Sequence, residues 1–339
     1  MTHNLLPGLQ IVAEVAQGFE GNPAQAALLI RAAAKSGADA VKFQLVFADE
    51  LATPDYQYYD LFRGLEMSDE TWQSLADQCR AEGIALQVDI FGRRSLDLAA
   101  RIGVETVKLH GTDIANPGLL RDVAASSVPQ VMLGAGGAHL DEIDTALAVL
   151  ADKKVVVLLG FQAYPTPTDT NQIDRVGVLC ERFADASNVT VGFADHADPE
   201  NALRMALAAA ALGKGARVIE KHLTLGRNME LEDFESALNP DQFAEFATTL
   251  RGVDSALGVT ADSADFGMSE AEKSYRKMIR RHVVSAHALQ AGQLVEASDL
   301  VLKRAAIGNP LTDLDQSIGH RLVRDVAANS PLRANDLEG

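Results

Sequence analysis

The sequence places two lysines, two histidines and a glutamate at the ends of short apolar segments. Glu14 lies near the end of the first such segment, Lys42 and Lys108 lie in the second and fourth, and His196 and His222 come at the ends of the last two. Ammonium groups can neutralise a phosphate or a carboxylate, and neutral imidazoles are ligands for divalent metals. Two imidazoles alone leave coordination positions for water and substrate, which suits polarisation of a carbonyl group. These residue types therefore predict a metal-assisted site for an anionic substrate.

Carboxylates and amides occupy equivalent positions on the other segments. Glu14 can act as a base toward water or as a third metal ligand, and Asp89 and Glu220 end two further segments. An alternative is that strand ends are simply where chains become polar, which explains isolated residues but not this combination. The same positions add four candidates: Gln44, Gln162, Tyr164 and Asp195.

Alternation of short β-branched segments with Ala/Leu-rich amphipathic stretches supplies the elements that position these residues. Nearly continuous apolar strands are typical of a parallel sheet that is buried on both faces. Eight such units predict an α/β fold, a closed (β/α)8 TIM barrel, whose active site lies at the C-terminal ends of the strands. An open doubly wound sheet is the alternative, and the absence of Gly-x-Gly-x-x-Gly after the first strand weakens it. The predicted strands are Gln10–Ala16, Ala40–Phe43, Ala85–Val88, Thr106–Leu109, Gln130–Leu133, Val155–Leu159, Val189–Phe193 and Arg217–Glu220.

Helices and domain limits follow from caps and from a change of pattern. Asn22 can cap the first helix, with Pro23 in its first turn. From His282 onward the sequence is typical of short strands and turns, and VEASDL at 295–300 recurs loosely as LRANDL at 332–337. We predict a barrel over residues 1–263, a linker and helix over 264–281, and a small β-rich domain over 282–339. Further predicted helices include Asp69–Gly83, Ser95–Gly103, Pro199–Gly213, Asn239–Leu257 and Ser269–Arg281.

Composition restricts the class of protein. The 339 residues include 47 acidic and 30 basic side chains, and the net charge of −17 argues against a nucleic-acid partner or an anionic membrane surface. No stretch approaches the length of a membrane span, and the N-terminus has no secretory pattern. Two cysteines, Cys79 and Cys180, do not make a disulfide framework. We therefore expect a cytoplasmic protein.

Six motifs follow one another along the chain: Ile11–Gly21 (IVAEVAQGFEG), Ala40–Gln44 (AVKFQ), Tyr164–Pro167 (YPTP), Gly192–His196 (GFADH), Ile219–Thr224 (IEKHLT) and Leu238–Pro240 (LNP). Their order and spacing resemble those of the N-acetylneuraminate (sialic acid) synthase family. The tail resembles that family's antifreeze-like (SAF) domain, including Lys303-Arg304. No single motif is decisive, but the ordered combination is specific.

The resemblance implies a reaction. In that family a (β/α)8 barrel condenses phosphoenolpyruvate with an amino sugar in its open-chain aldehyde form. It implies that His196 and His222 hold a divalent metal, Mn²⁺ or Mg²⁺, which polarises the aldehyde that C3 of phosphoenolpyruvate attacks. Glu14 then assists water attack at C2, and phosphate leaves by C–O cleavage. Lys42 and Lys108 match lysines that contact phosphoenolpyruvate.

The resemblance also implies sugar contacts and a partner subunit. Gln44 and Tyr164 match residues near the sugar. Arg304 matches an arginine that reaches from the SAF domain into the partner subunit's site, in a domain-swapped homodimer. Taken together with the strand-end positions, the residues predicted to bind substrate are Gln44, Asp89, Thr112, Gln162, Tyr164, Asp195, Glu220 and Arg304.

Several positions depart from the family pattern. Where the family usually has Ser-Thr-Pro, this chain has Val88-Asp89-Ile90, so a hydroxyl on the phosphate side becomes a carboxylate. A carboxylate repels phosphate unless a lysine or a metal offsets it, so either Asp89 faces the sugar or the metal, or the donor substrate has changed. His110-Gly111-Thr112 stands where the family has Gly-Ser-Gly, and Thr112 can replace the lost serine. Three further departures remain: Gln162 replaces an Asn, Ala194 replaces a Ser, and Gly18-Phe19 replaces Asn-His.

Two other functions stay open. One is a pyruvate-dependent aldolase or lyase with a Schiff base on Lys42 or Lys108, and the metal-type histidines argue against it. The other is a degenerate, non-catalytic sugar-binding homologue. The joint retention of Glu14, both lysines, both histidines and Arg304 argues against that function.

Overall fold

The computed structural model describes residues 8–160, 162–258, 266–306, 308 and 310–338. The chain divides into two compact units, residues 1–258 and 259–339. The predicted boundary at residue 263 lies outside the described residues, so it stays a prediction. In the described part of the chain, no helix combines the length and the apolarity that a membrane crossing requires.

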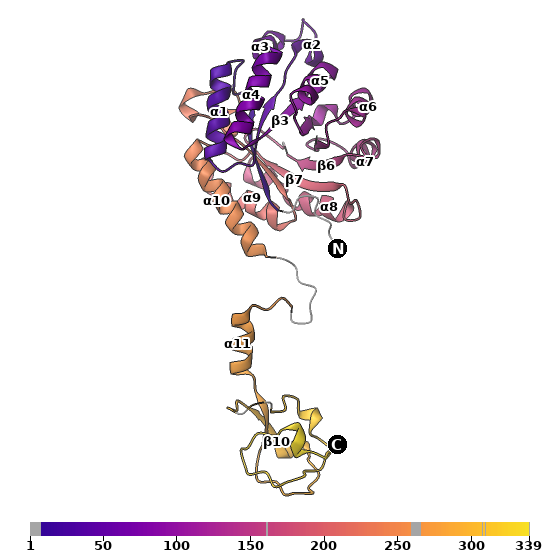
Figure 1. Ribbon diagram of the computed structural model, residues 1–339, viewed down its shortest axis with the longest axis vertical. Helices are drawn as coiled ribbons and strands as arrows, with labels where there is room; N and C mark the ends of the chain where they lie inside the picture. The colour runs from indigo at the N-terminus through magenta and orange to yellow at the C-terminus, as the bar shows by residue number, and fades with distance from the viewer. Residues whose placement is uncertain (1–7, 161, 259–265, 307, 309, 339) are drawn as a thin grey trace. The chain divides into compact units, whose positions relative to one another are not determined.

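The first unit is a closed barrel of eight parallel strands, which confirms the predicted fold (Figure 1). Each strand pairs with the next in sequence, and β8 pairs with β1 to close the barrel. The strands agree with the predicted segments to within two residues at either end: β1 (Gln10–Ala16), β2 (Ala40–Gln44), β3 (Ala85–Ile90), β4 (Thr106–Leu109), β5 (Gln130–Gly134), β6 (Lys154–Leu159), β7 (Val189–Asp195) and β8 (Val218–His222).

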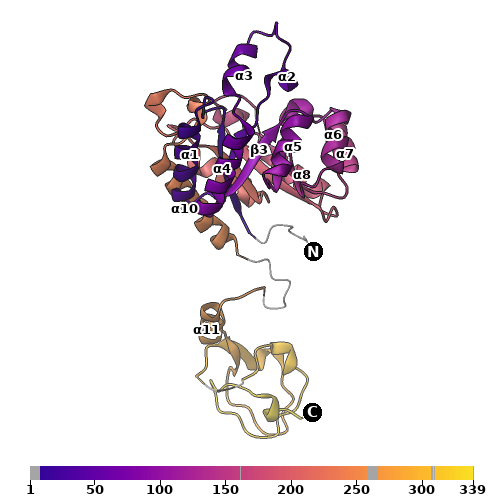
Figure 2. The ribbon, with the colours of Figure 1, turned by 45° about the horizontal axis from the view of Figure 1, so that its top comes forward.

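Helices alternate with the strands and surround the barrel (Figures 1 and 2). Two short helices, α2 (Ala48–Leu51) and α3 (Tyr59–Leu65), are inserted after β2, and both views place them beyond one end of the barrel. The other helices of this unit are α1 (Pro23–Lys35), α4 (Asp69–Glu82), α5 (Arg93–Arg101), α6 (Pro117–Ala125), α7 (Leu140–Val149), α8 (Asp174–Arg182), α9 (Arg204–Gly213) and α10 (Pro240–Leu257).

Short polar side chains set where two of these helices begin. Asn22 caps α1 as predicted, and its side chain accepts hydrogen bonds from two backbone N–H groups of the first turn. Helix α9 begins at Arg204 rather than at the predicted Pro199. Asp198 and Asn201 each accept a hydrogen bond from the N–H two residues later, at 2.8 Å. These local turns compete with the helical backbone and delay the helix.

One departure from the family pattern is explained by packing. Phe19, Phe43 and Trp72 are fully buried and meet edge to face, with ring centroids 5.7 to 6.1 Å apart. Such contacts add to the burial of large apolar side chains. Phe19, which stands in place of a polar residue, therefore belongs to the hydrophobic core.

The second unit is a small β region, as predicted. It contains α11 (Glu270–Ile279) and an antiparallel pair, β9 (His282–Ser285) with β10 (Leu300–Lys303). The loosely repeated segments form two 3₁₀ turns, in which buried Asp299 and Asp336 each accept a hydrogen bond from the N–H three residues earlier, at 2.9 Å. The unit has its own core: Val283, Leu289, Val295, Leu300, Leu322, Val326 and Leu332.

Candidate active site

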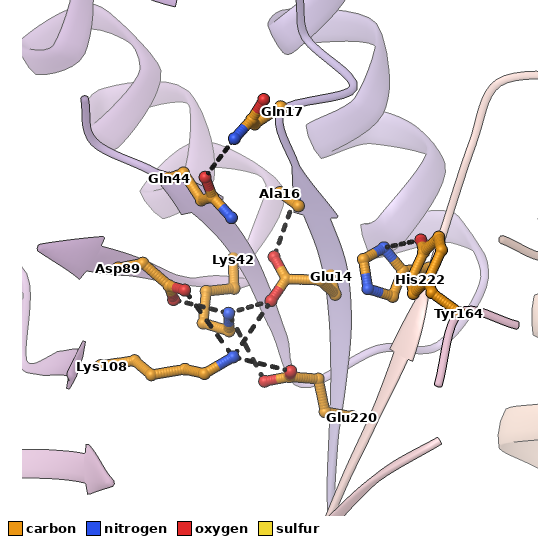
Figure 3. A network of polar contacts seen from close by, with 10 residues as sticks. All are labelled: Glu14, Ala16, Gln17, Lys42, Gln44, Asp89, Lys108, Tyr164, Glu220 and His222. Atoms are coloured by element: carbon orange, nitrogen blue, oxygen red, sulfur yellow. Dashed lines mark hydrogen bonds and ion pairs between the residues drawn. The ribbon is translucent and has the colours of Figure 1, made fainter. Parts of the chain in front are cut away.

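Five charged side chains from five strands converge inside the barrel (Figure 3). They are Glu14 on β1, Lys42 on β2, Asp89 on β3, Lys108 on β4 and Glu220 on β8. Register pairs place Glu14 beside Lys42, and Asp89 beside Lys108. Because side chains along a strand alternate with a period of two, residues in register on neighbouring strands share a face. Barrel closure therefore joins residues that are far apart in the sequence.

Lys42 is the centre of this charged cluster. Its Nζ forms an ion pair with Glu14, lies 2.6 Å from Oδ1 of Asp89, and lies 3.5 Å from Oε2 of Glu220. Nζ of Lys108 lies 3.1 Å from Oε1 of Glu220 and 3.7 Å from an oxygen of both Glu14 and Asp89. The side chain of Lys42 is fully buried, whereas that of Lys108 is 12% exposed. Of these two lysines, Lys108 is therefore the one that solvent reaches.

The charge balance of the cluster depends on Glu14. Burial raises the pKa of Glu14 to about 8, and the nearby lysines offset this rise only in part. Burial acts to lower the pKa of Lys42, but the adjacent carboxylates outweigh it and hold that pKa well above its ordinary value. For Glu220 burial acts to raise the pKa, but Lys108 and Lys42 outweigh it and lower that pKa. With a proton on Glu14, two ammonium groups face two carboxylates and the cluster is neutral.

Two imidazoles stand next to this cluster. The rings of His196 and His222 have centroids 5.3 Å apart, and the ring of Tyr164 packs against them at 5.5 and 5.6 Å. Burial lowers the pKa of His196 to about 4 and that of His222 well below its ordinary value. Both imidazoles are therefore neutral near pH 7 and keep a lone pair, as a metal ligand must.

The donor set fits the predicted divalent metal with an open coordination shell. Within the described residues, no group of three or more His, Cys, Asp and Glu side chains is arranged to hold a metal. The neutral imidazoles of His196 and His222 are the candidate ligands for the predicted metal. Such a shell leaves positions for water and substrate oxygens.

Two hydrogen bonds connect the site to residues that the sequence analysis missed. The hydroxyl of Tyr164 donates to the backbone carbonyl of Asp233 at 2.7 Å, and Nε2 of Gln17 donates to Oε1 of Gln44 at 2.8 Å. Burial raises the pKa of Asp233 to about 6. Gln17 directly follows β1, so it satisfies the strand-end criterion that selected Gln44. Asp233 lies in the loop after β8, where no periodic pattern marks it.

Asp195 is a predicted site residue that the structure does not bring to the charged cluster. Its Oδ1 lies 3.2 Å from Nζ of Lys221, and both side chains are fully buried. Lys221 also donates to the carbonyl of Ala197 at 2.7 Å. Because Asp195 precedes His196 by one position, its side chain lies on the other face of the strand. The predicted substrate contact of Asp195 remains a prediction, while its ion pair links the ends of β7 and β8.

A hollow of about 430 Å³ opens beside Lys108 and His196. Five of its lining residues are glycines, so backbone groups form part of its wall. The backbone is close-packed there, because a Cβ on Gly111 would lie 2.8 Å from the carbonyl oxygen of Gly136. The remaining lining residues are His110, Gly134, Gly137, Leu158, Gly160 and Ala194.

Three other predicted residues are not part of the charged cluster as the structure describes it. Gln162 is partly buried, and its Nε2 has no hydrogen-bond partner among the described residues. The side chain of Thr112 lies outside the described part of the chain. Arg304 belongs to the second unit, where it lines a hollow of about 420 Å³ together with Lys303 and Asn329. Its predicted contact with a partner subunit's site remains a prediction.

The fold and the strand-end site define a (β/α)8 barrel protein that brings an acid, two lysines and two neighbouring imidazoles together at the strand ends. The chain belongs to the NeuB family, whose model matches residues 29–262. Residues 280–338 match the SAF domain.

Similar proteins align with nearly the whole chain. An N,N'-diacetyllegionaminic acid synthase of Campylobacter jejuni is 29% identical, covering 91% of this chain and 94% of the relative. A pseudaminic acid synthase of the same species is 24% identical, covering 96% of each. The crystal structure of a spore coat polysaccharide biosynthesis protein E of Chromobacterium violaceum has a TM-score of 0.82 at 25% identity, covering 98% of this chain and 100% of that one.

Proposed function

We propose that this protein condenses phosphoenolpyruvate with an open-chain N-acetylated amino sugar in a metal-dependent reaction that yields a nonulosonic acid and phosphate. The observation that carries the proposal is the convergence of Glu14 and Lys108 with the His196–His222 pair at the strand ends. Membership of the NeuB family supports the reaction class. The relatives named above make different acids, so the proposal specifies the acceptor by class and leaves the individual sugar open.

Each residue has a role that its surroundings support. A divalent cation bound by His196 and His222 would polarise the aldehyde carbonyl. Lys108, at the edge of the hollow, binds an anionic group of the donor. Glu14 holds a proton near neutral pH, so it can donate that proton during C–C bond formation and later accept one from the water that attacks C2. Breaking the C–O bond then releases phosphate.

The charge state of Lys42 bears on the aldolase alternative. A Schiff base requires an unprotonated amine, but the carboxylates around Lys42 hold its pKa well above the ordinary value. Lys42 therefore stays an ammonium ion, which supports the phosphoenolpyruvate reaction over a pyruvate reaction at that residue. We further propose a cytoplasmic homodimer in which Arg304 completes the partner subunit's site, as the family resemblance implies.

A phosphate-release assay tests the proposed function. The full-length chain is incubated with phosphoenolpyruvate and each of a panel of N-acetylated hexoses, with Mn²⁺, with Mg²⁺, and with EDTA. We expect phosphate release that requires both substrates, stops with EDTA and returns on addition of metal. Release from phosphoenolpyruvate alone, or release that EDTA leaves unchanged, would contradict the proposal. Borohydride trapping of pyruvate on the protein without metal would support the aldolase, and sugar binding without turnover would support a degenerate homologue.

A further inference from the structure

The carboxylate of Asp89 neutralises part of the positive charge of Lys42 and Lys108. Its Oδ1 lies 2.6 Å from Nζ of Lys42, and its Oδ2 lies 3.7 Å from Nζ of Lys108 (Figure 3). The side chain is 1% exposed, so these contacts lie in a buried interior where charges interact strongly. Together with Glu14 and Glu220, three carboxyl groups surround two ammonium groups. Lys42 and Lys108 are therefore the groups that face the unusual carboxylate at position 89.

The glycine-lined hollow reaches only part of this cluster. Lys108 lines it, whereas Lys42 and Asp89 are absent from its described lining. Lys42 is fully buried, and its Nζ is already in contact with all three carboxyl groups. An anion in the hollow would therefore meet one lysine rather than two, and Asp89 already faces that lysine.

We propose that Asp89 is a specificity-determining residue, an internal anion that competes with a substrate phosphate for Lys108. The inference rests on the proposed function, because it concerns the donor's phosphate. Position 89 is one where the family pattern has a hydroxyl, and a hydroxyl donates a hydrogen bond to phosphate where a carboxylate repels it. The site thus favours a donor whose phosphate contacts Lys108 and backbone N–H groups, and it binds free phosphate weakly.

Calorimetric titration of the metal-free, full-length chain with inorganic phosphate and with phosphoenolpyruvate tests this proposal. Asp89→Asn removes the charge at nearly constant shape, and Asp89→Thr introduces the hydroxyl. Both variants are expected to bind both ligands about tenfold tighter or more than the wild type does, since one repulsive charge is gone. The affinity for pyruvate, which lacks phosphate, is expected to change less. Equal or weaker phosphate affinity in both variants, or binding too weak to measure in both, overturns the proposal.

Asp39→Asn is a matched control in the same barrel. Asp39 precedes β2 at its opposite end, where it lies 2.8 Å from Arg251 and accepts a hydrogen bond from the N–H of Ile11. This variant removes the same charge without touching the cluster, so phosphate affinity is expected to stay unchanged. If the Asp89 variants do not fold, single lysine variants of the chain with Asp89 intact provide the test. Lys108→Met is then expected to weaken phosphate binding more than Lys42→Met, and the reverse order contradicts the proposal.

The two proposals fail in different ways, because affinity is measured here without turnover. Tighter phosphate binding in the Asp89 variants, with no phosphate release from any aldose, would remove the proposed function and leave the role of Asp89 intact. Turnover by the wild type, with phosphate affinity unchanged in the variants, would remove the role of Asp89 alone.

Discussion

Glu14 holds its proton because of where it lies. The side chain is 3% exposed, and burial disfavours the charged form more than Lys42 and Lys108 favour it. A pKa of about 8 is close to the value that suits a group that both gives and takes a proton near neutral pH. This buried environment is what supports our proposal that Glu14 transfers the proton.

Replacing Glu14 by glutamine separates the proton from the shape of the side chain. Glu14→Gln mimics the protonated carboxyl, so the free energy of unfolding is expected to change by less than about 1 kcal/mol at pH 7. Turnover is expected to fall about 100-fold or more, because an amide cannot transfer the proton. Phosphate release and urea unfolding measure the two effects. Glu181→Gln, on the exposed face of α8, is the control, and an equal loss in both variants would contradict the assignment.

The buried histidines make stability depend on pH on the acid side. The folded pKa of His196 is about 4, below the ordinary 6.5, so the unfolded chain binds more protons between these values. The stabilising contribution is present above pH 6.5 and is lost as the pH falls toward 4. Between pH 7 and pH 4, metal-free wild type is expected to lose about 2–3 kcal/mol more unfolding free energy than His196→Asn. If the unfolding free energies of the wild type and His196→Asn, measured by urea unfolding, fall equally between pH 7 and pH 4, this prediction is wrong.

At the scale of elements, strand register explains why much of the site could be predicted. The period of two puts Lys42 and Gln44 on one face, and barrel closure puts β1 beside β8, so Glu14 and His222 become register partners. These relations follow from the order of apolar segments. The same alternation indicates that Asp195, one position before His196, faces away from the cluster.

Other features depend on tertiary contacts that no periodic pattern encodes. The position of Asp233 beside Tyr164 depends on the path of the loop after β8, where Asp233 has a φ of 66°. The burial of Phe19 against Trp72 depends on how α4 packs against the segment after β1 and against Phe43 of β2. Which carboxylate meets which lysine also follows from side-chain packing inside the barrel, so the sequence predicted the charged groups but not their pairing.

The Asp195–Lys221 ion pair is expected to hold the ends of β7 and β8 together. Lys221→Met leaves a buried carboxylate without its partner, and we expect this variant to lose about 3–5 kcal/mol of unfolding free energy. Asp195→Leu combined with Lys221→Met removes both charges, so it is expected to be clearly more stable than Lys221→Met alone. Urea unfolding measures both variants.

An exposed ion pair provides the comparison for that experiment. Arg182 and Asp144 are each 42% exposed, and Arg182→Met is expected to cost less than about 1 kcal/mol. A loss from Lys221→Met no larger than the loss from Arg182→Met would show that the buried pair does not stabilise the strand ends.

At the scale of the whole molecule, the proposed homodimer makes a prediction about mixed subunits. His222→Ala and Arg304→Ala are each expected to abolish most turnover as homodimers. If Arg304 completes the partner subunit's site, co-expression of the two variants restores about a quarter of the sites, because half of the dimers are mixed and each of these has one intact site. Activity of the co-expressed mixture no higher than that of the better single variant would contradict the exchange of Arg304 between subunits.

We propose that the imidazoles of His196 and His222 hold one divalent metal ion beside the charged cluster. Titration with Mn²⁺, followed by the electron paramagnetic resonance signal of the free ion, tests it directly on the full-length chain. We predict one bound Mn²⁺ per chain for the wild type and loss of that site when both histidines are replaced by alanine in a chain that still unfolds cooperatively. A double variant that binds Mn²⁺ with the same stoichiometry and affinity as the wild type would contradict the account.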